Sequence, residues 1–207
     1  MKSNKYESVR ELLRSGRKGS LIVIGTYPDC DKTAIAVDIA INTAVEQKTP
    51  VAVFSLDMSK EQLAERFLHN QVNVGDNVDH GVLAMAKMPI FTCDTRDCSI
   101  SDFCDTAKNL VINEGVQLII INYLQLMSGW PEDHGMRIPE VNHIVQTLKE
   151  TAVSLDVNII VMSQLTRYKQ TDTDVRVKPT IKDIRSTNAI EEYVDLVLIE
   201  DSPTGVS

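Results

Sequence analysis

The sequence predicts a doubly wound α/β domain, in which helices cover both faces of a mostly parallel sheet. Short apolar runs of strand length alternate with longer segments whose apolar residues recur at helical spacing. Turn-forming residues separate these segments. The most apolar run, VQLIIINYLQLM (116–127), has the composition of a central strand that is buried on both faces. Ligands of such sheets bind at the carboxyl ends of the strands.

Two strand–loop–helix units are expected in the first third of the chain. The run SLIVIG (20–25) predicts a strand, the turn-rich TYPDCD follows it, and KTAIAVDIAINTAV (32–45) predicts a helix. The run VAVFSL (51–56) predicts a second strand before a helix that begins at Ser59. Ser59 and Gln62 have the spacing of a capping box, in which each side chain bonds the other residue's backbone N–H.

The same alternation continues to the end of the chain. Ser99 and Asp102 have capping-box character at the start of a third helix. A Gly-, Pro- and His-containing loop follows the most apolar run, and Val141 to Leu155 then trace one helical face. The expected later elements are a strand in MPIFTC (88–93), a helix at 99–114, a strand in 116–127, a loop at 128–140, and strands in 157–165 and 194–200. We expect a lead helix and linker over 1–18 and one domain over 19–207.

Composition sets the broad class. The chain has 207 residues, of which 43% are apolar and 24% are charged, as expected of one soluble domain. No apolar run approaches the roughly 20 residues of a membrane helix, so we expect a cytosolic protein. A net charge of -8 argues against a chain that holds nucleic acid alone, although a local basic loop is compatible with it. The four cysteines lack paired C-x-x-C spacing, which favours reduced thiols over zinc.

The loop after the first strand is a degenerate phosphate-binding loop. Lys32 and Thr33 match the Lys and hydroxyl of G-x-x-x-x-G-K-[ST], whereas Thr26 and Asp31 replace its glycines. At about 4 Å and an effective dielectric near 20, one carboxylate against one phosphate charge costs roughly 4 kcal/mol, so we expect nucleotide binding to be weak or absent. The candidate nucleotide-binding residues are Pro28, Asp29, Cys30, Asp31, Lys32 and Thr33.

Several blocks of sequence resemble the C-terminal motor domain of the DnaB-family replicative DNA helicases. The blocks are FSLDM followed by SKEQLAERFL (54–68), NYLQLM (122–127), SQLTR (163–167) and DIRSTNAIEEYVDLVLI (183–199). They occur in the family's order over nearly the whole chain. The resemblance implies a RecA-like P-loop NTPase fold, ATP and Mg²⁺ as cofactors, single-stranded DNA as a partner, and a role in DNA replication.

The resemblance also implies roles for individual residues. Asp57 falls where the family has a glutamate that polarises the attacking water, and its side chain is one methylene shorter. Asn122 falls where the family has the acid that supports Mg²⁺ through water, and Thr33 would also serve the metal. Gln164 matches a residue that senses the γ phosphate. A polar strand end is the alternative interpretation of Gln164.

The loops after the fourth and fifth predicted strands would line a DNA channel in the hexameric relatives. The candidate DNA-binding residues are Arg167, Lys169, Arg176 and Lys178. Acidic residues are interspersed among them, so an ordinary mixed-charge surface loop is the alternative. Trp130, the only tryptophan, could stack on a base or fill its own loop.

Two functional hypotheses follow. The first is a DnaB-like helicase ATPase domain that works in a homo-hexamer and is weakened in hydrolysis. The second is a non-catalytic relative that acts as a binding or regulatory module of a replicative helicase. Asp31, Asn122 and the lack of the family's C-terminal segment with its arginine finger support weakened catalysis, because single losses of this kind commonly cost on the order of a hundredfold. A RecA-class recombinase would share the fold but not the NYLQLM and SQLTR blocks.

Overall fold

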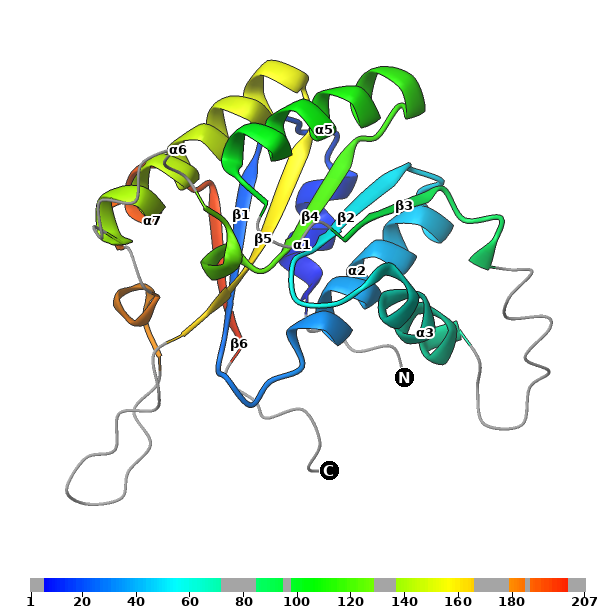
Figure 1. The fold of residues 1–207 in the computed structure, drawn as a ribbon, viewed down its shortest axis with the longest axis horizontal. Helices are drawn as coiled ribbons and strands as arrows, with labels where there is room; N and C mark the ends of the chain where they lie inside the picture. Colours follow the sequence, from blue (N-terminus) through cyan, green and yellow to red (C-terminus); the bar gives the residue numbers. More distant parts are fainter. Residues whose placement is uncertain are drawn as a thin grey trace.

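The computed structural model describes residues 6–71, 85–94, 98–128, 137–165, 179–184 and 187–200. This part of the chain forms one six-stranded sheet in the order β3-β2-β4-β5-β1-β6, and every neighbouring pair of strands is parallel (Figure 1). The predicted α/β class is therefore confirmed. The strands are β1 (Leu21–Thr26), β2 (Val51–Ser55), β3 (Ile90–Cys93), β4 (Leu118–Asn122), β5 (Asn158–Gln164) and β6 (Leu196–Glu200).

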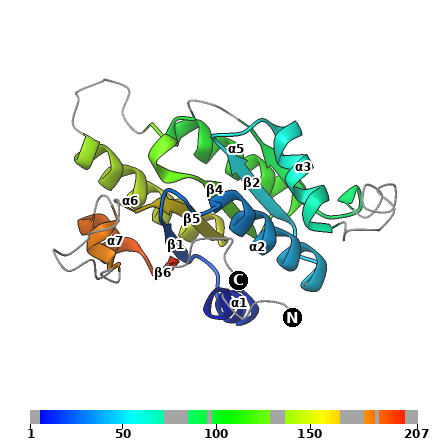
Figure 2. The same ribbon diagram turned by 90° about the horizontal axis from the view of Figure 1, so that it is seen from below.

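Helices cover both faces of the sheet, as the doubly wound prediction requires. On one face lie α1 (Glu7–Arg14), α2 (Lys32–Glu46) and α3 (Lys60–Gln71), and on the other lie α5 (Ile100–Glu114), α6 (Arg137–Leu155) and α7 (Thr187–Tyr193). The view in Figure 2 separates α1 and α2 from α5. Among the described residues, none of these helices has both the length and the apolar character needed to cross a membrane.

Strand β4 explains the long apolar run of the sequence. Leu118 and Ile120 pack in the core under α2, whereas Ile119 and Ile121 pack in the core under α5 and α6. Successive side chains of a strand point to opposite faces, so a strand covered on both faces needs apolar residues at every position. All four side chains are at most 1% exposed.

Four elements differ from the sequence-based expectation. The fourth strand ends at Asn122, and the rest of the apolar run forms a short 3₁₀ helix, η2 (Leu124–Leu126). Leu124 and Met127 are as buried as strand residues, so apolar periodicity could not separate the two conformations. Helix α6 begins at Arg137, inside the predicted loop 128–140, and α7 was not predicted. A second 3₁₀ helix, η3 (Ile181–Asp183), precedes α7.

Local capping signals position the helices that start near the carboxyl edge of the sheet. The amide oxygen of Gln62 accepts from the Ser59 N–H at 3.1 Å, and the Ser59 hydroxyl accepts from the Gln62 N–H at 3.3 Å, which confirms this capping box. At the next helix Ser99 accepts from the Asp102 N–H at 3.1 Å, but the Asp102 carboxylate bonds the Ser99 hydroxyl instead of its N–H. This helix therefore has the N-cap bond of a capping box but not the reciprocal bond from the third residue of the helix.

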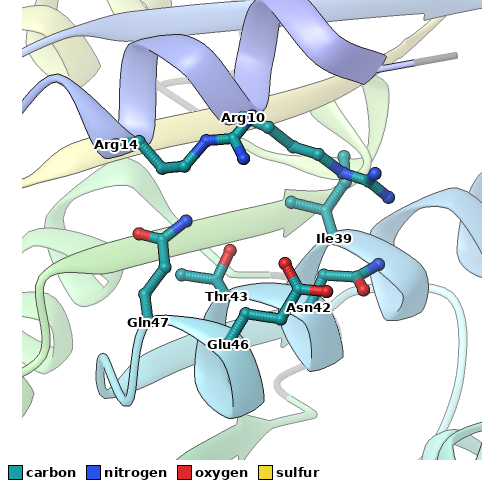
Figure 3. A pocket seen from close by; sticks show the side chains of 7 residues that line it. All are labelled: Arg10, Arg14, Ile39, Asn42, Thr43, Glu46 and Gln47. Carbon is teal, nitrogen blue, oxygen red and sulfur yellow. The ribbon is translucent and has the colours of Figure 1, made fainter. Parts of the chain in front are cut away.

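The lead helix α1 packs over α2. Its Val9 and the preceding Tyr6 are buried in the core on the α2 face, and Arg10 lies 3.5 Å from the Asp38 carboxylate. A small polar hollow remains between the two helices (Figure 3), lined by Arg10, Arg14, Ile39, Asn42, Thr43, Glu46 and Gln47. Both arginines are already paired, Arg10 with Asp38 and Arg14 with Glu7, so we interpret the hollow as a helix junction and not as an anion site.

A glycine near the end of β1 allows close packing against β5. A Cβ added at Gly25 would meet the side chain of Leu165 at 2.9 Å and that of Ile184 at 3.4 Å. Gly25 pairs with Ser163 and the next residue, Thr26, pairs with Gln164. The end of β1 therefore lies directly beside the end of β5.

Candidate functional site

The carboxyl ends of four adjacent strands bring the candidate residues together. Asn122 ends β4, Gln164 ends the neighbouring strand β5, and the loop to α2 follows β1 on the other side of β5. Asp57 lies two residues beyond β2, whose last residue pairs with Asn122. Residues that are far apart in the sequence thus meet at the edge of the sheet where α/β folds bind ligands.

Asn122 is the centre of this cluster. Its amide nitrogen donates to the Thr33 hydroxyl at 3.0 Å and to the Asp57 carboxylate at 3.1 Å. The residue is 1% exposed, and its amide oxygen is buried without a hydrogen-bond partner among the described residues. An unsatisfied buried acceptor costs about 1–3 kcal/mol, so this oxygen is where an additional donor would gain most.

Asp57 has a raised proton affinity. Burial of its carboxyl group raises the pKa of Asp57, and the nearby negative charge of Asp31 adds to the shift. Its own backbone N–H, the charge of Lys32 and the Ser55 hydroxyl act in the opposite direction without cancelling it. A carboxylate with a raised pKa is a stronger base than an ordinary aspartate.

The loop between β1 and α2 satisfies much of its own backbone. The Cys30 N–H donates to the Tyr27 carbonyl at 3.1 Å, and the Lys32 N–H donates to the Cys30 carbonyl at 3.0 Å. Tyr27 and Cys30 are buried, whereas the candidate residues Pro28 and Asp29 are exposed. A phosphate-binding loop turns such N–H groups toward its ligand, so this loop has fewer donors to offer in the conformation seen here.

Asp31 caps helix α2. Its φ of -75° is open to any residue, so the backbone does not require a glycine at this position. The Asp31 carboxylate accepts from the Ala34 N–H at 3.0 Å and lies 2.6 Å from the Arg66 guanidinium. A carboxylate thus occupies part of the helix N-terminus that would otherwise attract a phosphate. The charge of Arg66 offsets the repulsion that the isolated sequence predicted.

Lys32 points toward the end of β4. Its ammonium nitrogen lies 5.1 Å from the centre of the Tyr123 ring, within cation–π distance. Its charge also reaches Asp57. Lys32 and Thr33 therefore both lie close to the end of β4, where Asn122 and Tyr123 follow each other.

Gln164 is fixed through its backbone by a residue that the sequence did not single out. The Gln125 amide nitrogen donates to the Ser163 hydroxyl at 2.9 Å and to the Gln164 carbonyl at 3.2 Å. The Gln125 amide oxygen accepts from the Gln164 N–H at 3.1 Å. This clamp joins η2 to the end of β5. Gln125 stands inside the NYLQLM block, so the resemblance marked the position without showing its contacts.

Arg66 is the second residue that the sequence-based prediction missed. It stands in the SKEQLAERFL block, 35 positions from Asp31, and only the packing of α3 against α2 brings the two together. The predicted DNA-binding residues Arg167, Lys169, Arg176 and Lys178, with Trp130, lie outside the described residues. They stay predictions.

Lys32, Thr33 and Asn122 fit a nucleotide with a hydrated divalent cation, but they offer the cation less negative charge than the family pattern does. Lys32 and Thr33 match phosphate- and Mg²⁺-binding chemistry, and the unpaired Asn122 oxygen can accept from a metal-bound water. Asn122 adds no negative charge. Within the described ranges there is no cluster of three or more His, Cys, Asp or Glu residues that could hold a metal ion.

The strand order and the polar strand ends define a RecA-like domain, and solved structures agree. One solved structure, described as an ATPase domain, superposes with a TM-score of 0.77 at 21% identity, covering 96% of this chain and 83% of the other. A DnaB-like replicative helicase, whose structure is described with its primase interactions, gives 0.76 at 20% identity, covering 97% of this chain and 57% of the other.

Sequence comparison gives the family. The family described as DnaB-like helicase C terminal domain matches residues 3–202, and the chain belongs to it. The replicative helicase DnaB of Geobacillus stearothermophilus is 34% identical over 195 residues, which are 87% of this chain and 42% of that protein. A probable plasmid replicative DNA helicase of Chlamydia psittaci is 31% identical over 208 residues, covering 93% and 44%. The chain spans less than half the length of these relatives.

Proposed function

We propose that this chain is a helicase motor domain of DNA replication that binds ATP with Mg²⁺ weakly and hydrolyses it slowly. The observation that carries the proposal is the Asn122 amide, which joins the Thr33 hydroxyl to the Asp57 carboxylate at the strand ends. The side chains that we propose to be catalytic therefore lie together, but one charged group of the family pattern is replaced by a neutral one. Family membership and the RecA-like fold support the motor function.

Each residue of the cluster has a distinct task in this proposal. Lys32 and Thr33 would hold phosphate oxygens and the cation, which when bound supplies charge neutralisation for phosphoryl transfer. Asp57 would accept a proton from the attacking water, a role that its raised pKa favours. Asn122 positions Asp57 and Thr33 with its nitrogen and would hold a water with its oxygen. The Gln125 clamp fixes Gln164 at the same edge.

Slow hydrolysis follows from charge. A neutral amide in place of a carboxylate leaves the cation less tightly held, and Asp57 is shorter than a glutamate. Loss of one preorganised electrostatic group commonly costs on the order of a hundredfold or more in rate. The assembled geometry nevertheless supports turnover above background, since orientation and the remaining groups still contribute.

The partners proposed for the chain come from its relatives. We propose that the chain binds single-stranded DNA and assembles with like chains into a hexameric ring. The alternative is that it associates with the ring of a replicative helicase. The DnaB-like helicase of known structure is described as interacting with primase, and a primase-type partner is consistent with the shared fold.

A second function, that of a non-catalytic regulatory module, is favoured by one specific observation. The loop before α2 uses the N–H groups of Cys30, Lys32 and Ala34 within the chain. If that conformation persists in the presence of nucleotide, the chain would serve as a folded binding surface for a helicase and not as a motor.

Titration with a fluorescent ATP analogue in Mg²⁺ distinguishes the two functions. We expect saturable binding weaker than micromolar, loss of binding in Lys32→Ala, and no change in Lys108→Ala, an exposed lysine on α5 across the sheet. Slow phosphate release that single-stranded DNA accelerates would support the motor. No binding by the parent chain at millimolar nucleotide, together with tight association with a purified replicative helicase, would establish the regulatory module instead.

A further inference from the structure

Arg66 is a cation that reaches the loop before α2 from a different element. Its Nη1 atom lies 2.6 Å from Asp31 Oδ2, and the pair joins the middle of α3 to the first turn of α2. The Asp31 carboxylate uses its other oxygen to cap the Ala34 N–H. The guanidinium therefore lies beside the N-terminus of α2, on the residue that precedes Lys32.

The arrangement leaves Arg66 with capacity for another ligand. A guanidinium has five N–H donors in a planar fork, and Nη1 is the atom that contacts the carboxylate. The side chain is 44% exposed and borders a surface hollow that Met58, Gln62, Glu65 and His69 also line. The contact with Asp31 therefore leaves other N–H groups of the guanidinium available at the surface.

Charge makes a second cation necessary at this loop. Asp31 alone would repel a polyphosphate at the site where the family has a glycine, and Lys32 alone would only balance it. With Arg66 on Asp31, that carboxylate is neutralised and the charge of Lys32 is left for the ligand. Arginine is suited to this position because it can contact a carboxylate and a phosphate at the same time through different N–H groups.

We propose that Arg66 is a second phosphate-binding residue of this site, which stays on Asp31 and offers its remaining N–H groups to the phosphate oxygens of the nucleotide. The proposal rests on the nucleotide binding proposed above. It assigns to α3 a direct part in recognising the phosphate chain. It also explains how a loop with an acid beside its lysine can still accept a polyanion.

Binding of a fluorescent ATP analogue to Arg66 variants tests the assignment. Arg66→Gln should weaken binding about tenfold or more, the effect of losing a charge-assisted hydrogen bond. The affinity of Arg66→Lys should lie between that of the parent chain and that of Arg66→Gln. Competition by inorganic tripolyphosphate should weaken in parallel, whereas competition by adenosine should not change. Arg17→Gln is the matched control, because Arg17 is also an exposed arginine paired with an aspartate, Asp195, at the opposite end of the sheet.

The same substitution in an Asp31→Asn background separates a direct contact from simple neutralisation. A direct contact predicts that Arg66→Gln still weakens binding about tenfold when no carboxylate is present. If Arg66 acted only by masking Asp31, the loss would vanish in that background, and the assignment would be wrong. Absence of binding in every variant, Asp31→Asn included, would overturn the proposed function and this assignment together. Binding that is unaffected by Arg66→Gln in both backgrounds would overturn this assignment alone.

Discussion

The two ends of the sheet pair their polar groups to different extents. At the amino end, Asp195 accepts from the Leu21 N–H at 2.8 Å, from Lys149 at 2.6 Å and from Arg17 at 3.1 Å. Asn158 uses both ends of its amide, accepting from the Ser20 N–H and donating to the Arg17 carbonyl. At the carboxyl end, the Asn122 amide oxygen and the Thr26 hydroxyl are buried without a partner in the described part of the chain.

The difference agrees with our proposal that the amino end stabilises the fold and the carboxyl end binds a ligand. Buried polar groups of folded proteins are nearly always paired, and an exception needs a reason. Among the described residues the amino end has an exception too, the Ser20 hydroxyl, beside an otherwise closed network. The unpaired groups at the carboxyl end lie where α/β sheets bind ligands, which is the position of the nucleotide site that we propose.

The largest effect should come from the amino end. Asp195→Ala removes the acceptor of three hydrogen bonds, one from the backbone and two from cations, and should lower the free energy of unfolding by about 2–3 kcal/mol. Urea denaturation measures it, with Asp105→Ala on the exposed side of α5 as a control that should change little. Nucleotide affinity should stay at the parent value. A loss of affinity in a folded variant would show that the two ends are not independent.

The next effect concerns Asn122. Asn122→Asp puts a buried carboxylate beside Asp57 and should lower the free energy of unfolding by about 1–3 kcal/mol in the absence of divalent cations. Millimolar Mg²⁺ with nucleotide should recover part of that loss, measured as a shift in Tm. Asn109→Asp, the same change at an exposed position of α5, should show neither effect. Equal Tm values with and without Mg²⁺ for Asn122→Asp would argue against a cation site here.

A smaller effect is expected at the helix cap. Asp31→Gly should raise nucleotide affinity about tenfold. The gain should be smaller than for a carboxylate without a cation beside it, because Arg66 already offsets the charge of Asp31. The substitution should cost only a few tenths of a kcal/mol in stability, since glycine is a tolerated N-cap. Asp31→Asn keeps a capping oxygen without the charge and should gain affinity with no loss of stability. Unchanged affinity in both variants would exclude electrostatic repulsion by Asp31.

The smallest effect is on the acid stability of the amino end. Burial raises the pKa of Asp195, but the hydrogen bonds from Lys149 and Leu21 and the charges of Lys149 and Arg17 outweigh it and leave the pKa below 3.8. The unfolded chain therefore binds the proton first. The stabilisation is present above about pH 3.8 and is lost as the pH falls through the lower folded value. Asp195→Asn should have a flatter stability profile between pH 5 and pH 3 in urea titrations; parallel profiles would contradict the assignment.

Much of the fold could be predicted because its determinants are local or periodic. β4 is apolar at successive positions and α2 carries apolar residues at helical spacing, and both patterns are visible in the sequence. The 3₁₀ helix after Asn122 could not be separated from the strand, because Leu124 and Met127 are buried in either conformation. Helix α7 has only seven residues, too few for periodicity to decide.

The sequence predicted which residues form the candidate site better than it predicted the contacts between them. The degenerate phosphate-binding loop marked Thr33, the family-like blocks marked Asp57 and Asn122, and the structure brings these three together. Which atoms of Asn122 are paired depends on side-chain geometry, which no pattern of residues encodes. The Asp31–Arg66 pair depends on how α3 packs against α2, and the repulsion expected from Asp31 alone was therefore too large.

The close packing at Gly25 links the position of the loop after β1 to the position of the end of β5. A methyl group added at Gly25 would lie 2.9 Å from the side chain of Leu165, which would have to shift to admit it. Gly25 and Thr26 are in register with Ser163 and Gln164, so the base of the loop and the end of β5 cannot slide past each other independently. A displacement of Gln164 would therefore be transmitted to the base of the loop through this strand pairing.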